Sequence, residues 1–392
     1  MQKLLIVCGP TSSGKTALAL ELAKKWNGEL VSADSRQVYR GMDIGTGKDV
    51  IGKSKVKSQK LKLQIKNQKY ELIPYDMDGI PLWLVDVVDP DEEFSVAHYQ
   101  HIAHKVIEDI QKRGKLPIVV GGTGQYVQSL LSPIETSHIP PNKKLRKQLE
   151  KLSLEDLQNQ LVDRYHRMWE TMNQSDRQNP RRLIRKIEIA KYLSCHPGYH
   201  LSIPGIKEVP IPGIKTQKYD ILLLGLSAPY PVLYKGIDAR VDKRVKQGVR
   251  EEITSLLKKG YTWEMPSMNT FGYKEWKEYF THNSPACSDA PARIDTRSVS
   301  GRAASGRQLL PAGRHGVTHN LQPIIQRWKW DEHGYARRQM TWFKKMKGIH
   351  WADITEKGWQ KKVETVVNEW YTNKERCTRG ESEKISKVAS RA

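Results

Sequence analysis

The chain has 392 residues, of which 38% are hydrophobic and 28% charged, and its formal net charge is +22. This length allows two or three domains, and the positive excess favours a polyanionic partner, because lysine and arginine release counterions from phosphates. No apolar run is long enough to cross a bilayer, so we expect a cytoplasmic protein that does not enter a membrane. The cysteines form neither a CxxC pair nor a metal-binding spacing, which favours a reducing compartment.

Short apolar runs alternate with helical patterns through the first third of the chain. Strands are predicted at 3–8, 29–33, 82–88 and 116–120, and helices at 15–26 and 95–112. A fifth apolar run, 219–226, follows only after a long interruption. This order predicts an α/β fold, with an open, mostly parallel sheet flanked by helices and interrupted by an insertion.

The interruption has helical periodicity from 141 to about 199, and a proline- and glycine-rich stretch leads back to the sheet. Lysines alternate with apolar residues at 51–70, which predicts a basic surface hairpin. Segment 282–318 is rich in Ser, Ala, Gly, Pro and Arg and has few large apolar residues, so we expect it to be disordered. The predicted division is a first part of the core at 1–136, a helical insertion at 137–212, a second part of the core at 213–280, a disordered insertion at 281–319, C-terminal helices of the core at 320–372 and a disordered tail at 373–392.

A phosphate-binding loop follows the first strand. Its sequence fits the GxxxxGK[ST] pattern between a strand and a helix, with the residues Gly9, Pro10, Thr11, Ser12, Ser13, Gly14, Lys15 and Thr16. Backbone N–H groups of such a loop surround a phosphate, the lysine neutralises it and the threonine hydroxyl binds Mg²⁺. The register of strand, loop and helix disfavours the alternative of a simple glycine turn. The loop predicts a P-loop core with Thr16 as a magnesium ligand.

Most such loops bind ATP or GTP, but the fourth strand ends in Gly121-Gly122-Thr123-Gly124, where a hydrolase would place a carboxylate for magnesium. Asp86 and Asp89 after another strand could replace that carboxylate, so an ATPase or kinase stays possible on these residues alone. Asp34 follows the second strand and is predicted to lie beside the phosphate loop, because ligands bind at the carboxyl ends of parallel strands. It could accept a proton or hold magnesium through water, or it could simply cap a helix.

Several blocks, in order, resemble the bacterial tRNA dimethylallyltransferase family, also called tRNA isopentenyltransferases. They include GPTSSGKTALALELA, SADSRQVYRGMDIGTGK, GKLPIVVGGTGQYVQSLL, NPRRLIRKIEI, LYKGIDARVDKRVKQGVREEI and YARRQMTWFKK. The resemblance implies transfer of a dimethylallyl group from dimethylallyl diphosphate to N6 of the adenosine 3′ to the anticodon, in tRNAs that read codons beginning with U. It implies a monomer that uses Mg²⁺ and binds the anticodon loop of tRNA.

The resemblance also implies roles for individual residues. The loop from Gly9 to Thr16 would bind the donor diphosphate instead of ATP, Asp34 would take the proton from N6, Thr123 would line the reaction channel, and Arg240 would bind the leaving diphosphate. Residues that would contact tRNA are Asp34, Ser35, Arg36, Gln37, Arg181, Arg182, Arg185, Arg338 and Gln339.

Two positions depart from the family pattern: Gly236 stands where an arginine is common, and Glu332-His333 replaces a threonine–arginine pair. Three other functions are weighed against the family's. A small-molecule P-loop kinase would not explain the SADSRQVY and GGTGQY blocks, and an enzyme that prenylates free adenine nucleotides would not need the charge of +22. An RNA-binding protein without catalysis is disfavoured by the presence of Lys15, Thr16, Asp34 and Arg240.

Overall fold

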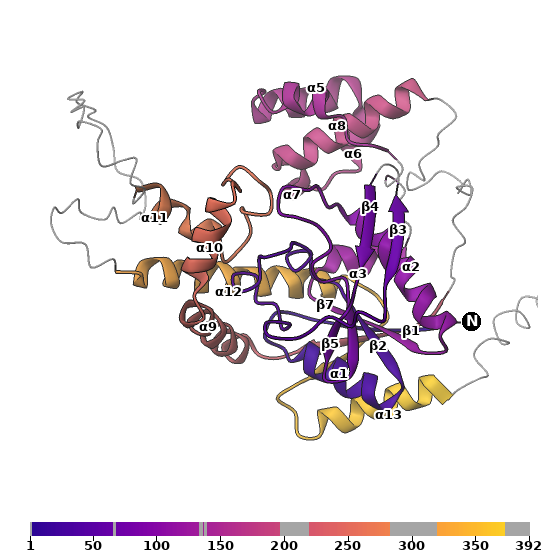
Figure 1. Ribbon diagram of the computed structural model, residues 1–392. Coiled ribbons are helices and arrows are strands. Elements are labelled where there is room, and N and C mark those ends of the chain that lie inside the picture. The colour runs from indigo at the N-terminus through magenta and orange to yellow at the C-terminus, as the bar shows by residue number, and fades with distance from the viewer. Residues whose placement is uncertain are drawn as a thin grey trace, which may run out of the picture. The chain divides into compact units, whose positions relative to one another are not determined.

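The computed structural model describes residues 2–65, 68–132, 136, 139–196, 219–282 and 320–372. The chain divides into two compact units, one formed by Met1–Gln128 with Tyr219–Ala392 and the other by Ser129–Lys218 (Figure 1). From residue 283 on, the predicted disordered insertion lies outside the described residues, as does the predicted tail.

Among the described residues, the first unit contains a seven-stranded sheet with the order β5-β6-β2-β7-β1-β8-β9. All neighbours are parallel except β5 and β6. The strands are β1 (Gln2–Cys8), β2 (Gly28–Ser32), β5 (Tyr75–Met77), β6 (Ile80–Trp83), β7 (Leu116–Gly121), β8 (Tyr219–Ser227) and β9 (Ile349–Asp353). The predicted α/β fold with a mostly parallel sheet is thereby confirmed.

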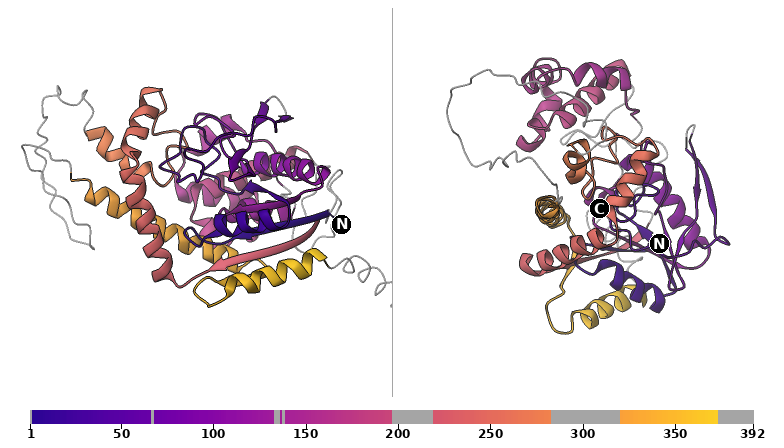
Figure 2. Two further views of the ribbon diagram at one scale, coloured as in Figure 1. Left: turned by 60° about the horizontal axis from the view of Figure 1, so that its bottom comes forward. Right: turned by 60° about the vertical axis from the view of Figure 1, so that its left-hand side comes forward.

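Helices cover both faces of this sheet. The described helices of the first unit are α1 (Lys15–Lys25), α2 (Val96–Lys112), α9 (Tyr230–Lys246), α10 (Val249–Lys258), the 3-10 helix η1 (Lys274–Trp276), α11 (Lys277–His282), α12 (Gln322–Lys344) and α13 (Trp359–Thr372), while α3 (Gly124–Leu131) runs from the first unit into the second. Figure 2 shows α1 and α13 on one face of the sheet and α2 on the other. The side chains of Leu5, Val7 and Leu224 point toward α1 and α13 and form one buried core with Leu22 and Val367. Alternate strand residues face the opposite side, so every central strand is buried on both faces.

The structure corrects two predicted elements. The apolar run 82–88 is a strand only as far as Trp83, because Leu84 and Asp86 adopt φ angles of 66° and 57° that no strand contains. The basic hairpin is shorter than predicted, with an antiparallel pair formed by β3 (Leu61–Ile65) and β4 (Gln68–Leu72). Segment 51–60 forms turns and one isolated bridge.

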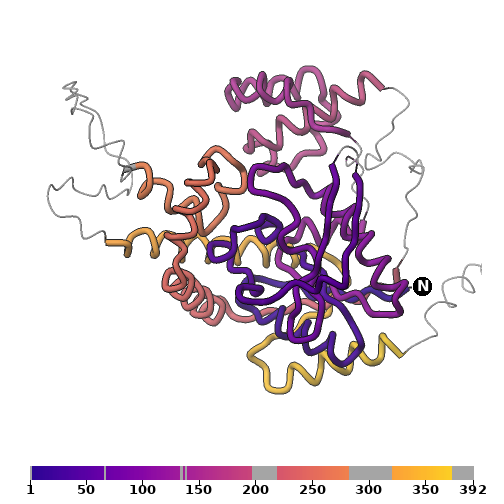
Figure 3. The backbone as a smooth tube through the Cα atoms, in the orientation of Figure 1, coloured from indigo at the N-terminus to yellow at the C-terminus, as the bar shows by residue number. Residues whose placement is uncertain are grey.

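The second unit is helical in its described part. It contains α4 (Lys143–Leu149), α5 (Leu154–Arg164), α6 (His166–Glu170), α7 (Gln174–Arg177) and α8 (Pro180–Cys195). The α8 helix begins where Asn179 caps the backbone N–H of Arg182 and Pro180 occupies the first turn. Its apolar face, which includes Leu183 and Ile187, packs with Leu157 and Leu161 of α5 into a core of its own. The tube in Figure 3 follows these helices in chain order. No helix in the described part of the chain is both long and apolar enough to span a membrane.

Candidate active site

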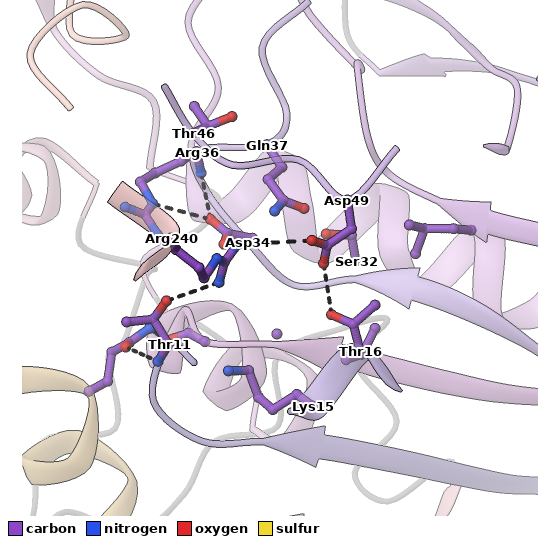
Figure 4. A pocket seen from close by; sticks show the side chains of 15 residues that line it. Thr11, Lys15, Thr16, Ser32, Asp34, Arg36, Gln37, Thr46, Asp49 and Arg240 are labelled. Carbon is purple, nitrogen blue, oxygen red and sulfur yellow. Dashed lines mark hydrogen bonds and ion pairs between the residues drawn. The ribbon is translucent and has the colours of Figure 1, made fainter. Parts of the chain in front are cut away.

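Three neighbouring strands end at one edge of the sheet and supply most of a cavity. The order β2-β7-β1 brings the segments that begin at Ala33, Gly122 and Gly9 side by side, as expected for ligand sites beyond the carboxyl ends of parallel strands. The cavity measures about 610 Å³ including open solvent. Its lining comprises Thr11, Lys15, Thr16, Ser32, Asp34, Arg36, Gln37, Thr46, Asp49, Leu82, Val120, Gly121, Gly122, Arg240 and Gln339 (Figure 4).

The phosphate loop has the backbone that its sequence predicts. Gly9 has a φ of 142°, and a Cβ atom there would overlap the carbonyl oxygen of Leu226, so the position requires glycine. Gly14, with φ 79°, immediately precedes α1 and lets the loop turn into the helix N-terminus. Inside the loop, Pro10 contributes a carbonyl oxygen that accepts hydrogen bonds from Ser13 Oγ at 2.9 Å and Lys15 Nζ at 2.5 Å. The hydroxyl of Ser12 is buried without a hydrogen-bond partner among the described residues.

The ammonium group of Lys15 is held beneath the cavity in a poorly solvated position. Burial lowers its pKa to about 8, and the nearby charge of Arg240 acts in the same direction, while Asp34 opposes the shift. A bound polyanion would reverse the balance, because it would favour the charged ammonium. Lys15 is therefore a cation that an anionic ligand stabilises.

Asp34 lies in the same cavity as the phosphate loop, as predicted. Its Oδ1 accepts a hydrogen bond from the backbone N–H of Arg36 at 3.0 Å, and the Arg36 Nε atom is 3.7 Å away. The carboxylate is 19% exposed, and its Oδ2 accepts no hydrogen bond from the residues that the structure describes. One oxygen of Asp34 thus orders its own turn, while the carboxylate as a whole faces the cavity.

The neighbours of Asp34 connect it to the GGTG turn. Thr123 uses its hydroxyl to accept a hydrogen bond from the backbone N–H of Ser35 at 3.0 Å, and it lies 3.3 Å from the Ser35 hydroxyl. Gln37 lines the cavity, and its amide donates to the Gly47 carbonyl oxygen at 3.4 Å. The structure therefore brings Asp34, Ser35, Gln37 and Thr123 together at the strand ends.

Arg240 reaches the cavity from α9. Its guanidinium donates to Thr11 Oγ1 at 3.4 Å and to the Gly47 carbonyl oxygen at 3.1 Å, and it lies 3.9 Å from Asp49 Oδ1. Lys15 and Arg240 thus supply positive charge from two sides, which suits a diphosphate with several anionic oxygens.

A network of buried charges connects to Asp34 through Arg36. The Glu332 carboxylate of α12 pairs with Arg36 and with Arg244 of α9, each at 3.1 Å, and it is almost fully buried. Burial by itself would raise the pKa of Glu332, but the two guanidinium groups outweigh burial and hold the pKa at about 2. The side chain of Arg36, which was predicted to contact RNA, points inward and packs over the ring of Tyr335.

Gln339 and Arg338 occupy different faces of α12 although both were predicted to contact RNA. Arg338 is exposed and lies over the Phe271 ring. Gln339 is 6% exposed, and its amide bonds to the backbone of Thr11 and of Gly122. Gln339 is thus part of the cavity wall.

The three predicted RNA-binding arginines of α8 also differ. Arg181 and Arg182 are exposed, with Arg182 paired to Asp176. Arg185 is half-buried and donates to the carbonyl oxygens of Thr136 and Ile139, both at 3.0 Å, and to the buried carboxylate of Glu188. Arg185 therefore stabilises the second unit itself.

The two departures from the family pattern have distinct surroundings. Gly236 on α9 faces the phosphate loop, where an added Cβ would lie 3.2 Å from Ser12 Cβ. His333 bonds to Asp238 at 2.8 Å and stacks on Tyr234. An arginine at position 236 would begin beside the loop, where the cations of this chain that line the cavity are Lys15, Arg36 and Arg240.

Oxygen ligands suited to a hard cation meet beside the phosphate loop. The Thr16 hydroxyl donates to Asp49 Oδ2 at 3.1 Å, and both residues line the cavity with Asp34. No group of three or more His, Cys, Asp or Glu side chains within the described ranges could hold a metal. One or two carboxylates, a hydroxyl and substrate phosphates are nevertheless the ligands that Mg²⁺ commonly uses, so these residues fit a substrate-bound magnesium ion.

Asp49 and Glu332 belong to this site, although neither received a functional role from the sequence. Asp49 follows the GTGK stretch directly, and its position just after a block that lines the cavity was the available signal. Glu332 offered no local signal, because a glutamate on a lysine- and arginine-rich helix is usually solvated. Only the fold reveals that two arginines surround it.

Comparison with known proteins identifies the family of this site. The family model for IPP transferase matches residues 71–346, and the model for isopentenyl transferase matches residues 2–63. The tRNA dimethylallyltransferase of Roseiflexus sp. (strain RS-1) is 33% identical over 371 residues, 94% of this chain and 99% of that protein. The chain belongs to the tRNA dimethylallyltransferase family. The enzyme of that name from Thermomicrobium roseum is also 33% identical, over 92% of this chain and 89% of its own.

Solved structures agree with this family assignment. The full-length tRNA isopentenylpyrophosphate transferase of Bacillus halodurans has a TM-score of 0.56 and 29% identity, and the match covers 100% of both chains. A eukaryotic dimethylallyltransferase captured while acting on tRNA has a TM-score of 0.61 at 24% identity, with 100% of this chain and 81% of that chain covered. The latter likeness bears on the fold alone.

Proposed function

We propose that this protein transfers a dimethylallyl group from dimethylallyl diphosphate to N6 of the adenosine 3′ to the anticodon, in tRNAs that read codons beginning with U. One observation carries the proposal: in a chain of the tRNA dimethylallyltransferase family, the Asp34 carboxylate lines the same cavity as the phosphate loop and Arg240. A proton acceptor and a diphosphate site in one cavity are what transfer from a diphosphate to an amine requires.

In the proposed reaction, the N6 nitrogen forms a bond to C1 of the dimethylallyl group while the bond from C1 to the diphosphate oxygen breaks. The electron pair of the broken bond leaves with the diphosphate, and Lys15 and Arg240 stabilise the charge that grows there. Asp34 accepts the N6 proton, which becomes acidic as the new bond forms. Bound Mg²⁺ would add positive charge to the diphosphate, held by the Thr16 hydroxyl with the Asp49 carboxylate.

The exposed arginines Arg181, Arg182 and Arg338 support a large RNA substrate, as does the net charge of +22. Because the target base has to leave its stack to reach a cavity, a loop that is already partly unstacked lowers the cost. Ser35, Gln37 and Thr123 beside Asp34 would then contact the base and its neighbours. The protein is proposed to act as a monomer.

The test is incubation with dimethylallyl diphosphate, Mg²⁺ and unmodified tRNA, followed by mass spectrometry of the nucleosides. Asp34→Asn keeps the size and the Arg36 hydrogen bond but cannot accept the proton, so it should lower turnover by about 10²-fold or more. Donor affinity should change far less. Near wild-type turnover by this variant would contradict the role of Asp34, and rapid ATP hydrolysis without RNA would favour a kinase or ATPase instead.

A further inference from the structure

One hydrogen bond in the cavity is unexpected for a phosphate loop. The backbone N–H of Thr11, inside the loop, donates to the Oε1 atom of Gln339 at 2.9 Å. The Nε2 atom of the same amide donates to the Gly122 carbonyl oxygen at 2.8 Å. A side chain from α12 therefore takes up one of the loop's own backbone donors.

This amide is held firmly in place. Gln339 is 6% exposed, and its neighbours Ala336, Met340 and Phe343 on α12 are buried. A Cβ atom on Gly122 would overlap Nε2, so the absence of a side chain at that position makes room for the amide. Turning the amide over would place like atoms together at both ends, which fixes its oxygen toward Thr11.

The consequence is one fewer free backbone donor in the phosphate loop. Phosphate loops bind anions because successive backbone N–H groups point at the phosphate oxygens. At Thr11 that donor is occupied by Gln339 Oε1, so one backbone N–H of the loop is not available to a phosphate. A triphosphate has more anionic oxygens to satisfy than a diphosphate, and burying such oxygens without a donor is unfavourable.

We propose that Gln339 is a specificity-determining residue that restricts the phosphate loop to a diphosphate and disfavours a triphosphate. The inference rests on the proposed function, in which the loop binds the donor diphosphate. Lys15 and Arg240 still serve the two phosphates of the donor, since Arg240 lies 3.4 Å from Thr11 Oγ1. Gln339 thereby separates this site from nucleotide triphosphate sites built on the same loop pattern.

The experiment measures binding of inorganic pyrophosphate and inorganic triphosphate to the full chain by isothermal titration calorimetry, each with Mg²⁺. The wild type should prefer pyrophosphate, and dimethylallyl diphosphate should displace it. Gln339→Met fills a similar volume but leaves the Thr11 N–H free, so it should shift the affinity ratio toward triphosphate by about tenfold. Gln339→Glu keeps an acceptor facing Thr11 and should retain the preference for pyrophosphate.

Thr341→Ala is the matched control, because within the described part of the chain that hydroxyl bonds only to the Arg337 carbonyl oxygen on the same helix. It should leave the ratio unchanged. If Gln339→Met weakens both ligands equally, or if the Met and Glu variants shift the ratio alike, Gln339 only supports the fold and the inference is wrong. If dimethylallyl diphosphate does not displace pyrophosphate from the wild type, the proposed function itself fails, which is a different outcome.

Discussion

The affinity for dimethylallyl diphosphate should depend on pH through Lys15. Burial and the charge of Arg240 lower the pKa of this lysine to about 8 when no diphosphate is bound. A diphosphate against the ammonium favours the charged form and raises the pKa again. Below pH 8 the lysine is already protonated, so binding needs no proton. Above pH 8 the neutral lysine has to take up a proton on binding, and the observed affinity falls.

The size of the effect follows from the pKa of about 8. The fraction of protonated lysine falls about tenfold between pH 7 and pH 9, and the donor dissociation constant should rise by the same factor, about 1.4 kcal/mol. The phosphate groups of the donor lose their last protons near pH 6, so their charge is constant across this range. The change of donor affinity with pH therefore reports the protonation of the enzyme and not of the donor.

Calorimetric titration of the donor from pH 7 to 9.5 measures this dependence. Repeating it in buffers of different ionisation enthalpy gives the number of protons taken up, which should rise from near zero toward one. Lys15→Arg is the control, because a guanidinium stays charged and its profile should be flat even if its affinity is lower. A flat wild-type profile, or a sloping profile in the Arg variant, would show that another group is responsible.

Further substitutions test the charges in each unit. Glu332→Gln should destabilise the protein by about 3–5 kcal/mol in urea unfolding, because two buried arginines lose their shared counter-charge. The control Glu356→Gln, in an exposed pair with Lys362, should cost at most about 1 kcal/mol. Equal losses of stability in the two variants would contradict the buried network. In the second unit, replacing Arg181 and Arg182 by alanine should weaken tRNA binding and make its salt dependence shallower by up to about one unit per lost phosphate contact. Arg185→Ala should instead lower the thermal stability of the protein, because Arg185 bonds within this unit. Unchanged affinity and salt slope in the double variant would exclude this helix face from RNA binding.

The central sheet was predictable because its strands are continuous apolar runs. Strands at 3–8, 29–33, 116–120 and 219–226 are buried on both faces, and each was predicted within two residues of its bounds. Strand β9, with the sequence IHWAD, was missed because it lies at the sheet edge and has no buried apolar run. The run 82–88 misled in the opposite way, since apolar residues there fill the core from a turn with positive φ angles.

In the site, too, features set by nearby residues could be predicted, and features set by distant parts of the chain could not. The phosphate loop and Asp34 could be found because each follows a strand directly, and sheet topology brings strand ends together. The inward direction of the Arg36 side chain and the burial of Gln339 could not be predicted. Both depend on how α12, which begins only at Gln322, packs against the strand ends and the phosphate loop. A basic block such as YARRQ predicts RNA binding from composition, yet burial separates Gln339 from the exposed Arg338.

The helix α12 completes the site although it contains none of the sequence motifs for phosphate binding. Glu332, Tyr335 and Gln339 occupy one face of it at helical spacing. Glu332 and Tyr335 both contact Arg36, and Gln339 accepts a hydrogen bond from the phosphate loop. A fragment that ends before α12 would retain the phosphate loop, Asp34, Thr123 and Arg240. It would nevertheless leave the Arg36 guanidinium without the Glu332 carboxylate and the Thr11 N–H without its acceptor, so the motifs alone do not make the site.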